Sequence, residues 1–348
     1  VDAVLREAEL RRDHPAEPWK EAVFDTLYLG GGTPSVLEIA DCVRLFDGLS
    51  RLFHWSASPE ITFELNPEHR GLISALKRHT PVNRLSMGIQ SFRNERLRFM
   101  RRRHSGREAR EAIETAAAQG FDNLSIDLIY GLPDMAAAEW EAQLAEVAAY
   151  RPPHLSAYAL TVEPGSLLAR QVTAGQWRMP GQDILAEQYG ILIDWCNRQG
   201  YESYEVSNFA LPGHAARHNS RYWDIRTPYL GLGPGAHSFY QLPNVAAIRR
   251  ANLPDIRTYV SEPYGEARYE QETLKETDLY HEYVMTALRT SAGLDKARLA
   301  ALPPDLRTAC LQNLQPLLAD GLLYETGTAY RTTPAARYRA DGLALAFF

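Results

Sequence analysis

The stretch Thr26-Leu-Tyr-Leu-Gly-Gly-Gly-Thr-Pro-Ser35 decides how the rest of the chain is interpreted. Residues 24–29 alternate and are rich in β-forming side chains, which predicts a strand. Three glycines then leave bare backbone groups that a ligand can approach, and a helical pattern begins near Ser35. This places the loop at the carboxyl end of a strand, where α/β proteins bind ligands. The loop has neither dinucleotide-fingerprint spacing nor a P-loop lysine, so alone it fits a structural turn equally well.

The strand–loop–helix unit recurs along the first half of the chain. Further strands are predicted at 60–65, 82–88, 123–129 and 154–160, with helical patterns between them at 40–53, 71–79, 107–120 and 137–150. This alternation predicts parallel strands with right-handed crossovers. A polar residue stands at nearly every strand end: Glu64, Gln90, Asp127 and Thr161. Because these ends converge on one face, the pattern predicts a ligand site at the mouth of a parallel barrel.

Composition limits the classes of protein to which the chain can belong. Its 348 residues can bury a large core, and the net charge of -6 argues against a protein with a wholly basic, nucleic-acid-binding surface. No run is long and apolar enough to cross a membrane. The three cysteines, Cys42, Cys196 and Cys310, are far apart and form no C-x₂-C pair, so no zinc site or disulfide framework is indicated. We therefore expect a cytoplasmic protein with reduced thiols.

The chain opens on a helical pattern. Residues 1–12 predict an amphipathic helix whose charged residues are Glu7, Glu9, Arg11 and Arg12. A βα repeat normally begins with a strand, and none precedes this helix. We expect that the sequence starts inside its first strand–helix unit.

The second half changes character. A helix at 184–199 and a strand at 201–207 are followed by a loop, the segment Arg217–Trp223 and a second glycine loop, Gly231–His237. From about Thr277, three helices at 279–290, 295–302 and 304–319 and a hairpin at 324–331 resemble a winged helix. The third helix carries no basic stripe, so DNA binding is not favoured. The predicted domains are 1–210, 211–276 and 277–348.

Five motifs in this order and spacing resemble the radical SAM haem chaperone family, HemW, a close relative of the oxygen-independent coproporphyrinogen III oxidases. The resemblance covers almost the whole chain. The motifs are Gly30-Gly-Gly-Thr-Pro34, Phe63-Glu-Leu-Asn-Pro67, Asn83-Arg-Leu-Ser-Met-Gly-Ile-Gln-Ser-Phe92, Ile126-Asp-Leu-Ile-Tyr-Gly-Leu-Pro133 and Arg217-His-Asn-Ser-Arg-Tyr-Trp223. The resemblance implies an α/β fold, an incomplete parallel (β/α) radical-SAM-type barrel lacking its first strand, with a small helical, winged-helix-like carboxyl-terminal domain.

One departure from the family affects its chemistry. The family's first barrel strand carries a C-x₃-C-x₂-C loop that holds a [4Fe–4S] cluster with S-adenosylmethionine (SAM), and none of the three cysteines here matches it. Either the sequence is a truncated form or it is a natural member that lost its cluster, and the interrupted βα unit favours truncation. We expect the cluster in the full-length parent only, and no radical chemistry from the chain as written.

The resemblance also implies a SAM site, and the residue types suit that ligand. Glycine carbonyls at Gly31 and Gly32 and the Thr33 hydroxyl can accept from the SAM ammonium, and Arg102 can hold its carboxylate. Polar groups at the strand ends can take the ribose hydroxyls; these are Glu64, Gln90, Asp127 and Thr161. Apart from the resemblance, residues 101–103 equally fit a solvated helix end, Asp127 a helix cap, and Glu64 and Gln90 surface side chains.

The segment Arg217–Trp223 is linked to haem in the chaperone branch. His218 offers an imidazole for iron, and Tyr222 and Trp223 offer flat surfaces for a porphyrin. His237 is a weaker second candidate. The alternative is that these side chains are structural and His218 is merely hydrogen-bonded.

The function that the resemblance implies is haem binding and transfer to haem-acceptor proteins, with no nucleic-acid partner and no integral membrane segment. Two alternatives stay open. One is an oxygen-independent coproporphyrinogen III oxidase-like enzyme, and the other is a cluster-free tetrapyrrole-binding protein.

Overall fold

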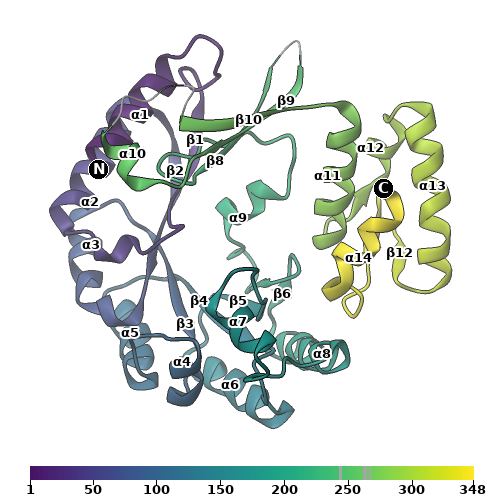
Figure 1. Ribbon diagram of the computed structural model, residues 1–348, viewed down its shortest axis with the longest axis horizontal. Helices are drawn as coiled ribbons and strands as arrows, with labels where there is room; N and C mark the ends of the chain where they lie inside the picture. Colours follow the sequence, from purple (N-terminus) through teal and green to yellow (C-terminus); the bar gives the residue numbers. More distant parts are fainter. Residues whose placement is uncertain (243–244, 262–264, 266–267) are drawn as a thin grey trace. The chain divides into compact units, whose positions relative to one another are not determined.

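The computed structural model describes residues 1–242, 245–261, 265 and 268–348 (Figure 1). They form two compact units. Unit 1 comprises Val1–Glu64, Leu72–Asn83 and Arg217–Thr286, and unit 2 comprises Leu65–Gly71, Arg84–Ala216 and Ala287–Phe348. Both units are α/β, and the predicted domain boundaries at 210 and 276 stay predictions.

Unit 1 contains the first two strand–helix repeats. Strand β1 (Val23–Leu29) pairs in parallel with β2 (His54–Leu65), from Val23↔His54 to Leu29↔Phe63, and the last residue of β2 belongs to unit 2. Between them the glycine loop leads through a 3₁₀ turn (Pro34–Val36) into α2 (Ile39–Leu52), and α3 (Ile73–His79) follows β2. The predicted helix near Ser35 thus starts at Ile39, because Pro34 and Leu37 first close the 3₁₀ turn. The parallel pairing of β1 with β2 is confirmed.

Unit 1 also holds a separate antiparallel sheet that the sequence analysis did not identify. Its order is β10-β9-β8, made by β8 (His237–Leu242), β9 (Val245–Asn252) and β10 (Tyr269–Leu274). Its apolar side packs Phe239, Ala247 and Leu274 together. The short helix α9 (Arg217–Tyr222) precedes β8, and the short helix α10 (Ile256–Ser261) lies between β9 and β10 in the chain.

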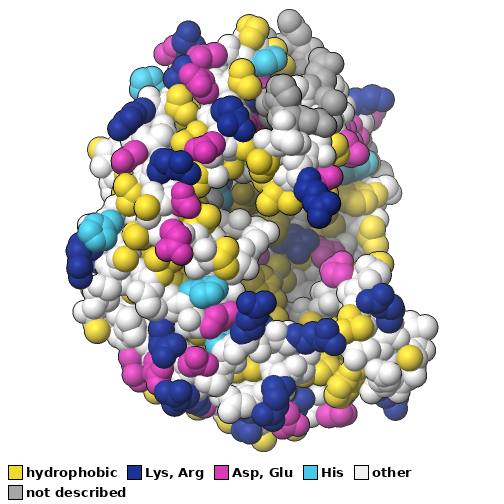
Figure 2. Space-filling view, turned by 60° about the vertical axis from the view of Figure 1, so that its left-hand side comes forward, with side chains coloured by type: hydrophobic (Ala, Val, Ile, Leu, Met, Phe, Trp, Pro, Cys, Tyr) yellow, Lys and Arg dark blue, Asp and Glu magenta, His cyan; other side chains and the backbone are white. Residues whose placement is uncertain are grey.

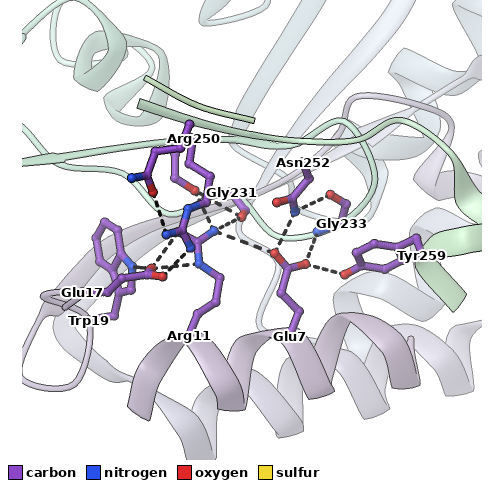
Figure 3. Close-up of polar contacts among 11 residues, drawn as sticks. Glu7, Arg11, Glu17, Trp19, Gly231, Gly233, Arg250, Asn252 and Tyr259 are labelled. Atoms are coloured by element: carbon purple, nitrogen blue, oxygen red, sulfur yellow. Dashed lines mark hydrogen bonds and ion pairs between the residues drawn. The ribbon is translucent and has the colours of Figure 1, made fainter. Parts of the chain in front are cut away.

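The first helix, α1 (Asp2–Asp13), buries two of its charges instead of exposing them. Arg11 donates to Glu17, to the Gly231 carbonyl and to Ser238 at 2.8–3.0 Å, and Arg250 from β9 donates to the other oxygen of Glu17 at 2.6 Å (Figure 3). The helix is therefore held to the second sheet by buried ion pairs. We call Glu7, Arg11, Glu17 and Arg250 the α1 network.

Glu7 completes this network one turn earlier on the same helix face. Its carboxylate accepts from the Gly233 backbone N–H at 2.9 Å and from Asn252 at 2.7 Å, and the Tyr259 hydroxyl also donates to it (Figure 3). Glu9 is exposed and Arg12 bonds exposed Asp13, so only Glu7 and Arg11 depart from the expected solvated face. The second glycine loop thus serves α1 directly.

Unit 2 continues the strand–helix alternation. Strands β3 (Arg84–Gln90), β4 (Asn123–Tyr130) and β5 (His154–Ala159) are parallel neighbours. The intervening helices α4 (Asn94–Phe99), α5 (Gly106–Ala118) and α6 (Ala137–Tyr150) lie along one side of these strands (Figure 1). Alternate strand residues such as Leu85, Met87, Leu124 and Ile126 are buried, whereas the intervening residues are polar. The polar face holds Arg84, Ser86, Ser125, Asp127, His154 and Ser156.

The strand predicted at 201–207 is wrong in detail. After α7 (Leu167–Thr173) and α8 (Gln182–Gln199), the chain forms two short strands, β6 (Glu202–Ser203) and β7 (Asn208–Ala210), and β7 pairs antiparallel with β5. Glu205 separates them, because its buried carboxylate accepts from the Ser207 N–H and the Asn208 amide and so closes a local turn. That turn divides the predicted strand into two shorter ones.

The carboxyl-terminal part has the predicted helices and hairpin. Helices α11 (Glu276–Arg289), α12 (Lys296–Ala300) and α13 (Pro304–Ala319) precede the antiparallel pair β12 (Leu323–Glu325) and β13 (Ala329–Thr332), and β11 (Leu294–Asp295) completes the order β11-β13-β12. The chain ends in α14 (Ala340–Ala344) and a 3₁₀ turn (Leu345–Phe347).

Basic and acidic side chains are interspersed on the face shown in Figure 2, which is the pattern of an ordinary solvated surface. Among the residues that the structure describes, no helix is both long and apolar enough to span a bilayer.

Candidate functional site

The first glycine of the loop is required because two side chains occupy its flank. A Cβ on Gly30 would lie 2.4 Å from the Tyr28 ring and 2.5 Å from a Glu64 carboxylate oxygen. The Tyr28 hydroxyl donates to that carboxylate at 2.8 Å. Glu64 at the end of β2 is thereby fixed against the loop that follows β1. The sequence analysis named Glu64 but missed Tyr28.

The loop beyond Gly30 is open. Gly31 has φ +78°, which favours glycine, and a Cβ on Gly31 or Gly32 would meet no atom within 4 Å. Gly31, Gly32 and Thr33 are exposed. Burial raises the pKa of Glu64, while hydrogen bonds from Tyr28 and the Gly31 backbone lower it. The loop therefore offers accessible backbone groups beside a partly desolvated carboxylate.

His218 of α9 packs against β1, the strand that leads into this loop. It is the second residue of α9, and its imidazole ring stacks on the Tyr28 ring with the two centroids 4.8 Å apart. Its Nδ1 is 3.0 Å from the Thr26 hydroxyl, and its Nε2 is 3.1 Å from the Tyr222 hydroxyl. Both ring nitrogens are thus engaged, so an iron ligand at His218 requires one of these hydrogen bonds to open. Tyr222 is 46% exposed and closes the side facing solvent.

The basic residues of this segment are paired with acidic or carbonyl groups. Arg217 donates to the carbonyls of Ser58 and Asp25, and Arg221 forms an ion pair with the Asp25 carboxylate. The backbone N–H groups of Arg217 and His218 donate to the carboxylate of buried Glu60. Trp223 follows α9 and is half-buried, and His237 is exposed at the start of β8, away from the His218 hydrogen bonds. The segment is well held, and its ligand role stays a prediction.

Unit 2 builds a second polar group around Gly88 of β3. A Cβ there would lie 2.9 Å from Arg102 Nη2, 3.0 Å from Gln90 Nε2 and 3.2 Å from Asn66 Oδ1. Arg102 donates to Asn66 at 2.6 Å and to the Gly88 carbonyl at 3.2 Å. We call Asn66, Gly88, Gln90 and Arg102 the Gln90 cluster. Of the three consecutive arginines only Arg102 turns inward, since Arg101 and Arg103 are exposed.

Gln90 itself has two unusual features. Its φ is +62°, which is uncommon for a residue with a side chain. Its Oε1 atom is buried and, among the described residues, accepts no hydrogen bond. An unsatisfied buried acceptor beside a guanidinium is the kind of group that a ligand donor completes.

The other two predicted residues lie further along the sheet. Asp127 is on β4, beside Ser156 of β5, and the Ser86 hydroxyl lies 3.5 Å from its carboxylate. The negative charge of Asp127 adds to burial in raising the pKa of Tyr158. Thr161 is exposed after β5. The structure therefore brings Gln90 and Arg102 together against Gly88, and Gly31 together with Glu64, while Asp127 lies on β4 and Thr161 follows β5.

The residues present fit SAM and do not fit an iron–sulfur cluster. The cradle at Gly88 and the unsatisfied Gln90 oxygen suit the polar amino-acid end of SAM. The three cysteines are buried and separate, and the described residues contain no group of three or more metal-ligating side chains. No step through a cluster can be derived from them.

Comparisons with known proteins identify the family to which the sequence is similar. The family model for the radical SAM superfamily matches residues 10–145, and the HemN C-terminal domain model matches residues 274–339. The chain is 34% identical to a heme chaperone HemW of Mycobacterium tuberculosis strain H37Rv, over 91% of this chain and 79% of that protein. It is 30% identical to a heme chaperone HemW of Escherichia coli K12, over 88% and 80%.

A solved structure shows the same fold. The structure reported as "Coproporphyrinogen III oxidase (HemN) from Escherichia coli is a Radical SAM enzyme" matches 99% of this chain and 82% of its own, with a TM-score of 0.80 and 24% identity. Likeness at this identity establishes the fold alone. The predicted incomplete radical-SAM-type barrel with a helical carboxyl-terminal region is confirmed.

Proposed function

This chain belongs to the HemW haem chaperone family of radical SAM proteins, and from that membership we propose that it binds haem and passes it to haem proteins. The observation that carries the proposal is the 30–34% identity to haem chaperones over about four fifths of their length. Haem-protein acceptors are proposed as its partners, and the individual acceptor is not specified.

Haem is proposed to bind at the segment Arg217–Trp223. Tyr222 offers an exposed aromatic face, and His218 Nε2 lies directly behind its hydroxyl. Rotation of Tyr222 would free this nitrogen for iron while the Thr26 hydrogen bond still orients the ring. Arg217 and Arg221 are available to propionates only in exchange for their contacts with Asp25.

SAM is proposed as the cofactor, as the radical SAM family implies. In that family SAM bound to a [4Fe–4S] cluster supplies radical chemistry, for which this chain's own cysteines give no ligands. Arg102 would hold the carboxylate of SAM, and the Gln90 amide oxygen would accept from its ammonium or a ribose hydroxyl. Gly31, Gly32 and Thr33 would present backbone and hydroxyl acceptors, and Glu64 would keep that loop in place. Asp127 and Thr161 stay candidates for the ribose contacts.

Haem transfer tests the function directly. The chain loaded with one equivalent of haem is mixed with apomyoglobin, and the absorption spectrum of holomyoglobin is followed. We expect haem transfer to apomyoglobin to be faster from the loaded chain than from a haem–albumin complex at equal concentration. In parallel, binding of coproporphyrinogen III to the chain is measured by calorimetric titration. Absence of haem binding would overturn the chaperone proposal, and binding of coproporphyrinogen III without haem binding would favour the oxidase.

A further inference from the structure

The chain makes a strained turn where β3 ends. The Ser91 N–H donates to the Ile89 carbonyl at 2.7 Å, which closes a three-residue γ-turn around Gln90. A γ-turn whose central residue has a positive φ is rare and strained, and here φ is +62°. Such a conformation persists only where the surroundings over-determine it. Residues 89–92, here called the Gln90 turn, are held by buried side chains on two sides.

His104 holds the turn from one side. Its Nε2 lies 3.1 Å from the same Ile89 carbonyl, and its Nδ1 lies 3.3 Å from Glu68. A carbonyl oxygen can only accept, so Nε2 must carry a proton. The side chain is fully buried, and burial lowers its pKa. His104 therefore gives up solvation for two contacts, one of them to the backbone of the turn.

Gln143 of α6 holds the turn from the other side. Its amide nitrogen donates to the Ser91 hydroxyl, and its amide oxygen accepts the Phe92 N–H at 2.9 Å. It is 2% exposed. Close packing adds to this, because a Cβ on Gly106 at the start of α5 would lie 2.0 Å from the Phe92 carbonyl. Every residue from 89 to 92 is thus contacted by a buried side chain or bonded within the turn.

We propose that His104 and Gln143 are positioning residues that lock the Gln90 turn, so that the Gln90 amide and Arg102 stay directed at one ligand, SAM. The inference rests on the proposed SAM site and adds two residues that touch no ligand themselves. Arg102 Nη2 donates to the Gly88 carbonyl, and His104 Nε2 donates to the Ile89 carbonyl. Two side chains of residues 102–104 thus bind two successive carbonyls of β3. A shift of His104 would therefore move Gln90 and Arg102 together.

The test compares His104→Leu with His104→Gln, whose amide N–H can still donate to the Ile89 carbonyl. SAM affinity is measured by calorimetric titration, and amide hydrogen exchange is measured at Ser91 and Phe92 without SAM. We expect His104→Leu to weaken SAM binding about tenfold or more, by analogy with other residues that orient ligand-binding groups. We expect it to lose exchange protection at Ser91, and His104→Gln to retain most of both. Arg103→Leu is the matched control, since its exposed side chain neighbours His104 in sequence.

The outcomes separate this inference from the proposed SAM site. Unchanged Ser91 protection and SAM affinity in His104→Leu, with a lower melting temperature, would overturn the positioning role and leave a merely structural histidine. Unchanged SAM affinity in Gln90→Ala would overturn the SAM assignment, while the exchange measurement still decides whether the turn is clamped. If His104→Leu does not fold, Gln143→Leu carries the same test at Ser91 and Phe92.

Discussion

Two polar groups of this protein differ in how their charges are matched: the α1 network is buried, and the Gln90 cluster is partly buried. In the α1 network, Arg11 lies within ion-pair distance of Glu7 and Glu17, and Arg250 pairs with Glu17. Each carboxylate also accepts a hydrogen bond from an uncharged N–H group. In the Gln90 cluster, Arg102 has no carboxylate within ion-pair distance among the described residues, and the Gln90 oxygen accepts nothing there. The charges of the first group are balanced, whereas in the second the charge of Arg102 is not matched by a carboxylate among the described residues and the Gln90 oxygen is left to accept a hydrogen bond.

This difference separates stability from binding. Balanced buried charges specify one arrangement of a helix on a sheet, and removing one leaves its partner uncompensated. An unsatisfied amide on a strained turn costs stability, which is typical of positions kept for a ligand. We therefore expect substitutions in the α1 network to change the free energy of unfolding, and substitutions in the Gln90 cluster to change ligand affinity.

The largest expected effect is at Arg11. Arg11→Met removes the cation between Glu7 and Glu17 and leaves buried negative charge, so the free energy of unfolding should fall by about 3–5 kcal/mol. Urea unfolding followed by circular dichroism measures the change. Arg12→Met on the exposed side of the same helix is the control and should change little. A small change at Arg11 would show that its ion pairs with Glu7 and Glu17 do not persist in solution.

A smaller effect is expected at the first glycine loop. Gly30→Ala places a methyl group 2.4 Å from Tyr28 and 2.5 Å from Glu64, so we expect overpacking that costs about 1–3 kcal/mol. Gly32→Ala meets no neighbour within 4 Å and has no positive φ, so it should be tolerated. Thermal melting of the two variants checks this. Equal melting temperatures would contradict the contact of Gly30 with Glu64.

Stability should also depend on pH through buried His154. It lies between the Ser125 and Tyr204 hydroxyls, and burial holds its pKa well below 6.5. As pH falls through 6.5 the unfolded state binds a proton that the folded state does not, so the free energy of unfolding falls by up to about 1.4 kcal/mol per pH unit. His154→Gln should flatten the profile between pH 7.5 and 5.5. An unchanged slope would mean that other groups dominate it.

The smallest effect on stability is expected at His218. His218→Ala removes hydrogen bonds to the Thr26 and Tyr222 hydroxyls at a partly exposed position, worth about 1 kcal/mol. If His218 is an iron ligand, the absorption spectrum of bound haem changes while the melting temperature moves little. A clear fall in melting temperature with an unchanged haem spectrum would make His218 structural and move the haem site elsewhere.

Sequence periodicity was sufficient for elements that depend on local pattern. The helices at 137–150 and 304–319 have the predicted bounds, and the strands at 123–130 and 154–159 end within one residue of prediction. Each of these segments buries one continuous face, and the periodic spacing of its apolar residues in the sequence indicates that face. The hairpin after residue 323 was likewise predictable from its turn residues.

Features that depend on distant partners could not be predicted. Glu7 and Arg11 look like surface charges of an amphipathic helix until Gly231, Gly233 and Asn252 are folded against them. Family motifs identified Gln90 and Arg102 as site residues, but not the residues behind them. His104 and Gln143 act on backbone groups of a strained turn, and no hydrophobic period indicates such a contact. The one available indication was the spacing of His104, which stands two residues after the site residue Arg102 in the sequence.

The most direct test measures SAM affinity and melting temperature together for Gln90→Leu and Arg11→Met. We predict that Gln90→Leu weakens SAM binding about tenfold, because it removes one hydrogen bond to a charged or polar ligand group, and leaves the melting temperature unchanged or higher. We predict that Arg11→Met lowers the melting temperature and leaves the affinity of the folded protein unchanged. A Gln90→Leu protein that melts lower and binds SAM as tightly as the unmodified chain would contradict the division between a charge-balanced structural network and a ligand-binding cluster.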